Sequence, residues 1–413
     1  MKNRIFYVTL LLILLGCQHE QLNEIPNEKA SNEFFVSESE AINVSLARPT
    51  AAMTRFYTHD KEIESCYAYC SEESATTQFY AINYKGGGFV IVSADKRTIP
   101  ILASSDEDYF VLEEEYLMPE GLWGWMKNIS CVIDSLRTNN LTQDEPVKSM
   151  WKSFVDISTR SDDGDDYDED GPDDEVVTPV CQGPNYGFRE TDAIVGPLLN
   201  TKWDQVNGYN SCIPKTCGMT NAPAGCVAVS LAQIMKYYKS PSTYNWNSMP
   251  DALPTDATSL FLLEIGKNIK INYDCDGSSA SNDNALSALK NKYGYITAKL
   301  ADYNYDKVRN EVLNAKRPVI LSGGSKGFLG VYKNGHSWIC DGVEVMGSYR
   351  CVYDEELKEY YTLRIAEYLY LHMNWGWGGR CDGWYSFSDF HPTGKEHSYN
   401  YKTEMITSLI PTL

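Results

Sequence analysis

The sequence has little positive charge relative to its negative charge. Its 413 residues include 36 Lys and Arg against 56 Asp and Glu, which gives a formal net charge of −20 at pH 7. A protein without a basic excess cannot offset the repulsion of phosphate groups, so nucleic acid is excluded as a partner. Half of the acidic excess lies in residues 161–175, SDDGDDYDEDGPDDE, and the rest of the chain is only mildly acidic.

Three other shortages limit the chemistry. No two cysteines have the CxxC spacing of zinc sites, so we expect no metal and no cofactor. Only six histidines are present, so a base for a catalytic cysteine must come from few positions. Beyond the N-terminus no apolar stretch is long enough for a transmembrane helix, so the remainder of the chain should be soluble.

The N-terminus is typical of an export signal. MKNR supplies positive charge, and IFYVTLLLILLG supplies an apolar run that is short for a bilayer. The run ends in LLGC, which resembles the lipobox of bacterial lipoproteins and implies a signal peptide over residues 1–17 with Cys17 as the lipid site. A plain cleaved signal is the alternative. We expect an exported bacterial protein, either a cell-envelope lipoprotein held at the outer membrane by its lipid or one secreted after processing.

Cysteine is abundant, with twelve residues, and eleven remain once Cys17 is set aside. An odd number in an exported protein indicates at least one thiol outside a disulfide. The close pairs Cys66 with Cys70 and Cys212 with Cys217 could each form a bridge or simply be buried.

The first half of the chain divides into a tether, a small domain and a linker. Residues 18–30 are polar and predict a tether. Residues 31–155 contain a β-hairpin pattern at 86–105 and helical spacing at 122–140, which predict a small α+β domain. Residues 156–185 hold the acidic run, which repels itself and should form an extended linker that is open to proteolysis.

The remaining residues, 186–413, are rich in Gly, Trp and Tyr. Helical patterns occupy the earlier part, and β-rich segments such as RPVILSGG and LYLHMNWGWGG occupy the later part. This order predicts an α+β domain with a helical lobe and a β-rich lobe.

The segment NAPAGCVAVSLAQIMKYY, residues 221–238, indicates a reactive cysteine. Apolar residues follow helical spacing at Ala228, Leu231, Ala232, Met235 and Tyr238. The proline and glycine of APAG break regular structure and place the helix start near Cys226. Its thiol would then lie among unpaired N–H groups at the positive end of the helix dipole, which favours the reactive thiolate. The alternative is that Cys226 is only the first buried residue of a core helix.

Two histidines are candidates for the base that a nucleophilic thiolate needs. His336, in NGHSWICDGV, follows a glycine at the start of a β-rich run, where strand ends often expose functional groups. His372, in LHMNWGWGG, shares a strand face with Asn374 by alternation and could instead be packed. Residue patterns alone favour His336.

Two further segments add candidates for the same site. Gln205, in LLNTKWDQVNGYNSC, could donate a hydrogen bond to a developing oxyanion, although a surface glutamine explains it better when it is taken alone. Residues 374–379, NWGWGG, place two tryptophans between glycines, which suits either an aromatic corner beside a cleft or a packed turn.

Together these motifs resemble the streptopain family of papain-like cysteine peptidases. The matching segments are WDQVNGYNSC, GCVAVSLAQIMKYYKSP, GHSWICDG and NWGWGG, and the resemblance covers about residues 190–395. Their spacing also matches, with His336 110 residues after Cys226 and Asn374 another 38 residues later. GFVIVSADKRTIPILASSDEDYF resembles the inhibitory prodomain that precedes these peptidases.

The resemblance implies roles for five residues. Cys226 matches the nucleophile, with its backbone N–H as one oxyanion donor, and His336 matches the general base and acid. Gln205 matches the oxyanion-hole glutamine. Asn374 matches the residue that orients the histidine, and Trp375 matches the residue that flanks it.

The resemblance also implies an organisation and an activity. It implies an inhibitory prodomain over 31–155, a cleavable linker over 156–185 and a papain-like catalytic domain over 186–413, with the nucleophile in the helical lobe and the histidine in the β-rich lobe. Such a zymogen would be a cysteine-type endopeptidase that hydrolyses polypeptides through an acyl-enzyme once its own prodomain, the intramolecular inhibitor, is removed. His372 fits a histidine that the family often carries outside the Cys–His dyad. Ser337 and Cys340 depart from the small or apolar residues that the family often has there.

Two other functions stay open at this point. An inactive relative could act as an inhibitor or binding protein, but it would not need Cys226, His336 and Gln205 together. A transglutaminase-like acyl transferase could use the same scaffold, but the prodomain resemblance and the export signal favour a protease.

Overall fold

The computed structural model describes residues 33–46, 61–71, 76–112, 118–158, 187–326, 332–386 and 401–412. The predicted signal peptide with its lipid site Cys17, the predicted tether over 18–30 and the acidic run over 161–175 lie outside these ranges. Within the described part of the chain, no helix is long and apolar enough to cross a membrane.

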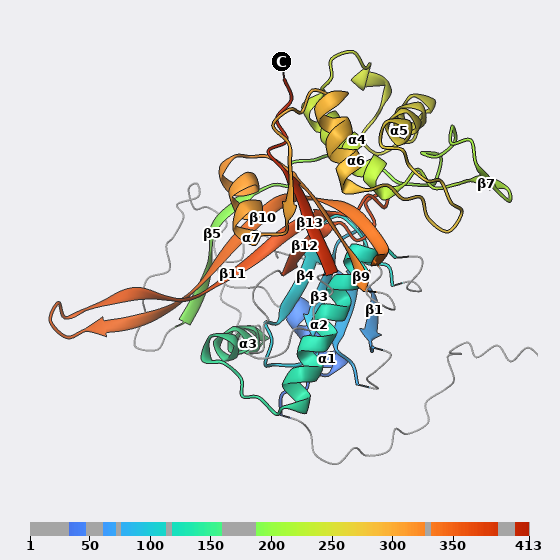
Figure 1. The fold of residues 1–413 in the computed structure, drawn as a ribbon. Coiled ribbons are helices and arrows are strands. Elements are labelled where there is room, and N and C mark those ends of the chain that lie inside the picture. Colours follow the sequence, from blue (N-terminus) through green and yellow to red (C-terminus); the bar gives the residue numbers. More distant parts are fainter. Residues whose placement is uncertain are drawn as a thin grey trace, which may run out of the picture. The chain divides into compact units, whose positions relative to one another are not determined.

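A large antiparallel sheet runs through the described residues (Figure 1). Its strands lie in the order β1-β2-β3-β4-β12-β11-β10-β9-β13-β8, and β5 pairs with β10 off this path. The strands are β1 (Ile63–Tyr69), β2 (Phe79–Tyr84), β3 (Phe89–Ser93), β4 (Ile101–Ser105), β5 (Gly187–Val195), β8 (Lys299–Asp302), β9 (Val319–Lys326), β10 (Tyr332–Asp354), β11 (Glu359–Asn374), β12 (Gly383–Ser386) and β13 (Tyr401–Thr407). A separate two-stranded pair joins β6 (Thr216–Cys217) to β7 (Thr220–Asn221).

The helices begin where the sequence supplies capping groups or chain breaks. The Thr255 side chain accepts a hydrogen bond from the Thr258 N–H at 3.1 Å, and the Ser281 side chain accepts one from the Asn284 N–H at 3.2 Å. Such caps satisfy N–H groups that the first helical turn leaves unpaired. The helices are α1 (Glu38–Leu46), α2 (Glu120–Thr138), α3 (Glu145–Ser158), α4 (Cys226–Tyr238), α5 (Asp256–Asn268), α6 (Asn282–Asn291) and α7 (Tyr305–Arg309), with short helical turns η2 (Trp246–Ser248) and η3 (Asn310–Asn314).

Both local predictions for the N-terminal part are confirmed. The hairpin pattern forms β3 and β4, which pair antiparallel, and the helical spacing forms α2. Leu122, Met126, Ile129 and Ile133 form a buried stripe along α2. That stripe belongs to a core that also contains side chains of β2, β3 and β4.

A buried ion cluster connects α2 to the β3–β4 turn. The carboxylate of Asp95 is fully buried and accepts hydrogen bonds from Arg97 Nε at 2.8 Å, Arg97 Nη2 at 2.7 Å and Arg137 Nε at 3.0 Å. Arg137 lies in the last turn of α2, and its Nη2 also donates to the Ala94 carbonyl at 3.0 Å. Asp95 therefore bonds to one arginine from α2 and one from the β3–β4 turn, which connects these two segments.

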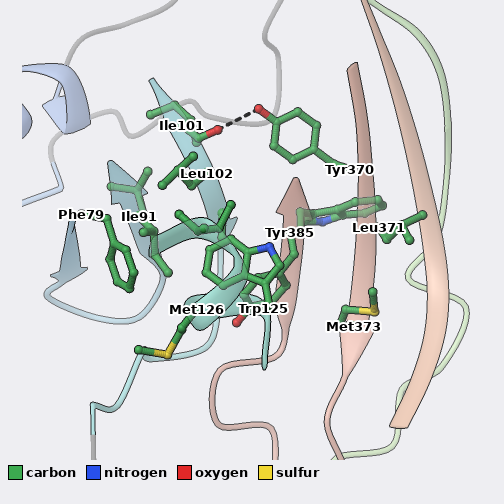
Figure 2. Close-up of a cluster of buried hydrophobic side chains, with 14 of the residues drawn as sticks. Phe79, Ile91, Ile101, Leu102, Trp125, Met126, Tyr370, Leu371, Met373 and Tyr385 are labelled. Carbon is green, nitrogen blue, oxygen red and sulfur yellow. Dashed lines mark hydrogen bonds between the residues drawn. The ribbon is translucent and has the colours of Figure 1, made fainter. Parts of the chain in front are cut away.

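The sheet continues from the N-terminal part into the C-terminal part. Strand β12 pairs with β4, with Trp384 opposite Ser104 and Tyr385 opposite Ala103. Tyr370 of β11 donates a hydrogen bond to the Ile101 carbonyl at 2.9 Å (Figure 2). One hydrophobic core therefore contains side chains from both parts, as Figure 2 shows for residues of β2–β4, α2, β11 and β12.

The two-lobed α+β fold expected for the C-terminal part is confirmed. Helices α4, α5 and α6 pack around a second core that includes Trp203, Leu231, Phe261 and Leu289. The β-rich lobe is formed by β5 and β8–β13, and α4 contacts β10 across the boundary between the lobes.

The disulfide within the described residues joins Cys217 to Cys275, across 58 residues of sequence. Neither close pair forms a bridge, because Cys66, Cys70 and Cys212 are not disulfide-bonded. Sequence proximity was therefore a poor guide to pairing, since the partner of Cys217 lies beyond α5.

We expect Asp95→Ala to lower the free energy of unfolding by about 3–5 kcal/mol, because it leaves two arginines without their buried carboxylate. Urea unfolding followed by tryptophan fluorescence measures the change. The matched control is Glu62→Ala, which breaks the exposed Lys85–Glu62 pair and should leave stability nearly unchanged. Equal losses for the two variants would contradict the importance of the buried cluster.

Candidate active site

Cys226 is the first residue of α4, as the sequence predicted, and it is buried. Gly225 before it has φ 90° and ψ 132°, a conformation that glycine adopts without strain. A Cβ on Gly225 would lie 2.4 Å from Ile271 Cδ1, so a side chain there would also displace Ile271. The glycine lets the chain turn sharply into the helix, so that Cys226 is the first helical residue, in the turn whose N–H groups have no partner within the helix.

His336 lies on β10, opposite Gly323 of β9. Its Nε2 lies 3.1 Å from the carbonyl oxygen of Trp375. Because a carbonyl only accepts, Nε2 carries the proton and Nδ1 keeps the lone pair. Burial lowers the pKa of His336 to about 4 despite the opposing effect of the Trp375 carbonyl, so the imidazole is neutral near pH 7.

Cys226 and His336 line the same cleft, which has a volume of about 640 Å³. The other walls are mostly polar and come from residues 279–284 at the start of α6, from Ser322 on β9 and from Glu404 on β13. The fold therefore brings a helix N-terminus of one lobe and a strand of the other lobe to one opening.

Gln205 is half-buried and is held through its backbone. Its N–H donates to Asp204 Oδ1 at 2.6 Å, and its carbonyl accepts from the Ala224 N–H at 2.7 Å. Asp204 Oδ2 accepts a further bond from Asn207 Nδ2 at 2.7 Å. The Gln205 segment is thus attached to the chain two residues before Cys226.

Asn374 and Trp375 follow one another at the end of β11. Asn374 Oδ1 accepts from Gln233 Nε2 at 3.0 Å and from the Gly376 N–H at 3.1 Å, and Asn374 Nδ2 donates to the Thr201 carbonyl at 2.7 Å. In this arrangement it is the Trp375 carbonyl that contacts His336. That Asn374 orients His336 stays a prediction.

His372 lies on β11 at a second hollow of about 470 Å³, which it lines together with Asp108, Lys202 and Asp382. Its Nδ1 lies 2.6 Å from Asp341 Oδ1. Burial disfavours the charged imidazole, but Asp341 and the nearby carboxylates outweigh this effect, so the pKa of His372 is raised. Among the described residues, His336 rather than His372 lines the cleft of Cys226.

Asp382 supports the segment that contacts His336. Its Oδ1 accepts a hydrogen bond from the Trp375 N–H at 2.8 Å, and burial raises the pKa of Asp382 to about 8. In the described part of the chain, no group of three or more His, Cys, Asp or Glu side chains is arranged to hold a metal ion.

Sequence reasoning missed three buried polar residues around this site. Asp204 directly precedes Gln205, while Ser230 and Gln233 lie on α4, four and seven residues after Cys226. Ser230 and Gln233 could have been recognised as polar residues at helical spacing from Cys226, but the apolar stripe of the same helix dominated the pattern.

Two regions of the chain match known families. Residues 203–385 match the Peptidase C10 family, and residues 28–133 match the Spi protease inhibitor. The first region contains all five predicted site residues, and the second overlaps the predicted prodomain over residues 31–133.

Individual relatives agree with these matches. The thiol protease/hemagglutinin PrtT of Porphyromonas gingivalis is 22% identical over 99% of this chain, which spans 44% of that protein's length. Streptopain of Streptococcus pyogenes is 22% identical over 88% of both chains. The solved prointerpain A fragment of Prevotella intermedia is 20% identical, with 86% of this chain and 100% of that chain covered at a TM-score of 0.54, which shows a shared fold. The chain therefore carries a region of the peptidase C10 type over residues 203–385 and an N-terminal region of the Spi protease inhibitor type over residues 28–133.

Proposed function

We propose that this protein is an exported cysteine endopeptidase, made as a zymogen, in which Cys226 is the nucleophile and His336 is the general base and acid. The observation that carries the assignment is that these two residues line one cleft although 110 residues separate them. A thiol at a helix N-terminus with an imidazole in the same cleft is the arrangement that nucleophilic acyl transfer requires.

Peptide hydrolysis then proceeds through two acyl transfers. The Cys226 thiol gives its proton to His336 Nδ1, and the sulfur attacks the peptide carbonyl. The Gln205 side-chain amide and the Cys226 backbone N–H donate hydrogen bonds to the oxyanion. His336 passes the proton to the leaving amine and then takes one from water, which attacks the thioester and releases the acyl group as a carboxylic acid. The Trp375 carbonyl holds the imidazole during these steps.

The N-terminal part supports a zymogen because α2 packs against the aromatic rings beside His336. A Cβ on Gly121 of α2 would lie 2.7 Å from Trp338 Cε3 and 2.9 Å from Trp375 Cζ3. The His336 ring stacks on Trp338 with 6.1 Å between ring centroids. Helix α2 therefore contacts the ring that stacks on His336, whose own burial keeps the imidazole neutral near pH 7.

We assign residues 31–155 to the inhibitory prodomain, 156–185 to the cleavable acidic linker and 186–413 to the catalytic domain. The family match over 28–133 and the acidic composition of 161–175 support this division. The N-terminal sequence supports export, with Cys17 as the site of a lipid anchor in the outer membrane or with secretion after processing.

Cys226→Ala in the chain from residue 18 to 413 is expected to abolish both maturation and peptide hydrolysis, because the variant has no nucleophile. Gel electrophoresis and cleavage of a fluorogenic peptide measure the two losses, while the wild-type chain should lose about 150 residues and gain activity, as the proposed boundaries require. His336→Ala should resemble Cys226→Ala, whereas His372→Ala should retain activity. A Cys226→Ala chain that still hydrolyses peptides would overturn the assignment, and transfer of the acyl group to added amines in preference to water would favour a transferase.

Gln205→Ala is expected to lower kcat by about 100- to 1000-fold, because it removes one of two oxyanion donors. KM should change little, since the amide acts on charge that develops in the transition state. The variant is matured with tagged wild-type protease that is then removed, and its kinetics are measured on a peptide substrate. Asn291→Ala, which removes an exposed amide on α6, is the control. A loss confined to KM would argue against the oxyanion role.

Gly121→Ala is expected to speed maturation, because its methyl group would push α2 away from Trp338 and Trp375. Alanine favours a helix over glycine by about 1 kcal/mol, so a faster release cannot come from melting of α2. The time course of conversion on gels measures the effect. Asn128→Ala, at an exposed position of the same helix, should mature at the wild-type rate. Slower maturation of Gly121→Ala would show that the contact does not restrain the active site.

A further inference from the structure

Helix α4 carries a polar stripe in addition to its apolar one. Cys226, Ser230 and Gln233 follow i, i+4, i+7 spacing and therefore share one face of the helix. All three are buried, with exposed fractions of 7% for Cys226, 1% for Ser230 and 1% for Gln233. Buried polar side chains in a core helix are costly unless they are hydrogen-bonded, so their partners indicate what they are for.

Ser230 connects the helix to the strand of the histidine. Its Oγ donates a hydrogen bond to the carbonyl of Ser337 at 3.1 Å. Ser337 follows His336 on β10, so one turn beyond the nucleophile the same helix face fixes the backbone that carries the base.

Gln233 connects the helix to two other segments of the site. Its Oε1 accepts from the Trp203 N–H at 3.3 Å, two residues before Gln205. Its Nε2 donates to Asn374 Oδ1 at 3.0 Å, one residue before Trp375. A single side-chain amide therefore spans the segment of the oxyanion donor and the segment whose carbonyl contacts His336.

The partners at both ends fix the orientation of the Gln233 side-chain amide. A backbone N–H only donates, so Gln233 must turn Oε1 toward Trp203 and Nε2 toward Asn374. The orientation of the Asn374 amide is fixed as well. Its Oδ1 accepts from the Gly376 N–H and its Nδ2 donates to the Thr201 carbonyl, so Oδ1 is the atom that faces Gln233. A side chain without a donor at the Nε2 position cannot take the place of Gln233 without leaving a buried group unpaired.

We propose that Gln233 is a positioning residue for the peptidase reaction, which sets the placement of Gln205 and of the Trp375 carbonyl relative to Cys226. The proposal rests on the proposed function of Cys226 and His336. Its role is indirect, because it acts through Trp203 and Asn374.

The test is Gln233→Glu in the full chain, because a protonated carboxyl imitates the amide and a carboxylate does not. The O–H of the protonated form can donate to Asn374 Oδ1, while the other oxygen accepts from the Trp203 N–H. The ionised form has only hydrogen-bond acceptors, so it cannot bond to Asn374 Oδ1 and repels that oxygen. Activity of this variant should therefore fall as the introduced carboxyl ionises.

Charged groups on neighbouring segments set where that ionisation occurs. Asp204 lies beside Trp203 and has Arg380 Nη2 at 3.8 Å, Asp382 bonds to the Trp375 N–H, and His372 lies two residues before Asn374. Burial and the two carboxylates favour the protonated form, while Arg380 and a charged His372 favour the ionised form.

The variant is matured at pH 5 and then assayed between pH 5 and 8, with active thiols counted by titration. We expect a kcat within about threefold of wild type at pH 5 and a kcat about 10- to 100-fold below wild type at pH 8, with KM unchanged, as for a misplaced catalytic geometry. Gln233→Leu should show the low kcat at every pH. A pH profile of Gln233→Glu that parallels wild type would overturn the proposal.

The matched control is Asn268→Asp, which makes the same amide-to-carboxyl change at a residue that does not line the cleft. Asn268 Nδ2 donates to the Tyr293 hydroxyl at 2.7 Å in the helical lobe. Asn268→Asp should lower stability, but its kcat should not fall between pH 5 and pH 8 relative to wild type. A fall in kcat as large as that of Gln233→Glu would show that any new carboxylate in the helical lobe lowers activity by destabilising the lobe. If wild type and Cys226→Ala hydrolyse the peptide equally, the proposed function is wrong. If Cys226→Ala is inactive but the pH profile of Gln233→Glu parallels wild type, the roles of Cys226 and His336 stand and Gln233 has no positioning role.

Discussion

The start of α4 is the constraint on which the rest of the site depends. Ten consecutive residues of this helix, 226–235, are buried, so its position is fixed by packing on every side. The left-handed Gly225 ends the preceding loop sharply enough that the helix begins at the cysteine itself. The positive end of the α4 dipole and its unpaired N–H groups consequently meet the cleft at Cys226.

The other components of the site are attached to α4 by bonds from separate segments. The Gln205 segment reaches the loop before Cys226 through the Ala224 N–H, and β10 is bonded to Ser230. Because α4 is packed on all sides, these bonds fix the Gln205 segment and the strand of His336 relative to Cys226. Packing thus supplies the preorganisation that acyl transfer uses.

Local features of the fold could be predicted from the sequence, and long-range ones could not. The helix start at Cys226, the stripe of α2 and the β3–β4 hairpin follow from periodicity and chain-breaking residues within a few positions. The β4–β12 pairing and the Cys217–Cys275 disulfide join distant residues, and no local pattern specifies a partner. The ring partner of His336 was missed for a related reason, because a backbone carbonyl such as that of Trp375 carries no residue-type signal.

The shared sheet explains why zymogen activation would need proteolysis and not only loosening. Strand β4 pairs with β12, and Tyr370 and Trp125 donate hydrogen bonds across the same boundary, to Ile101 and Ser386. While one chain joins the two parts, the effective concentration of the prodomain at this surface stays high, and transient opening is followed by rebinding. Cleavage of the proposed linker converts this intramolecular contact into a bimolecular one, which dilution can break. Separation would then remove α2 from Trp338 and Trp375, two residues that contact the His336 ring.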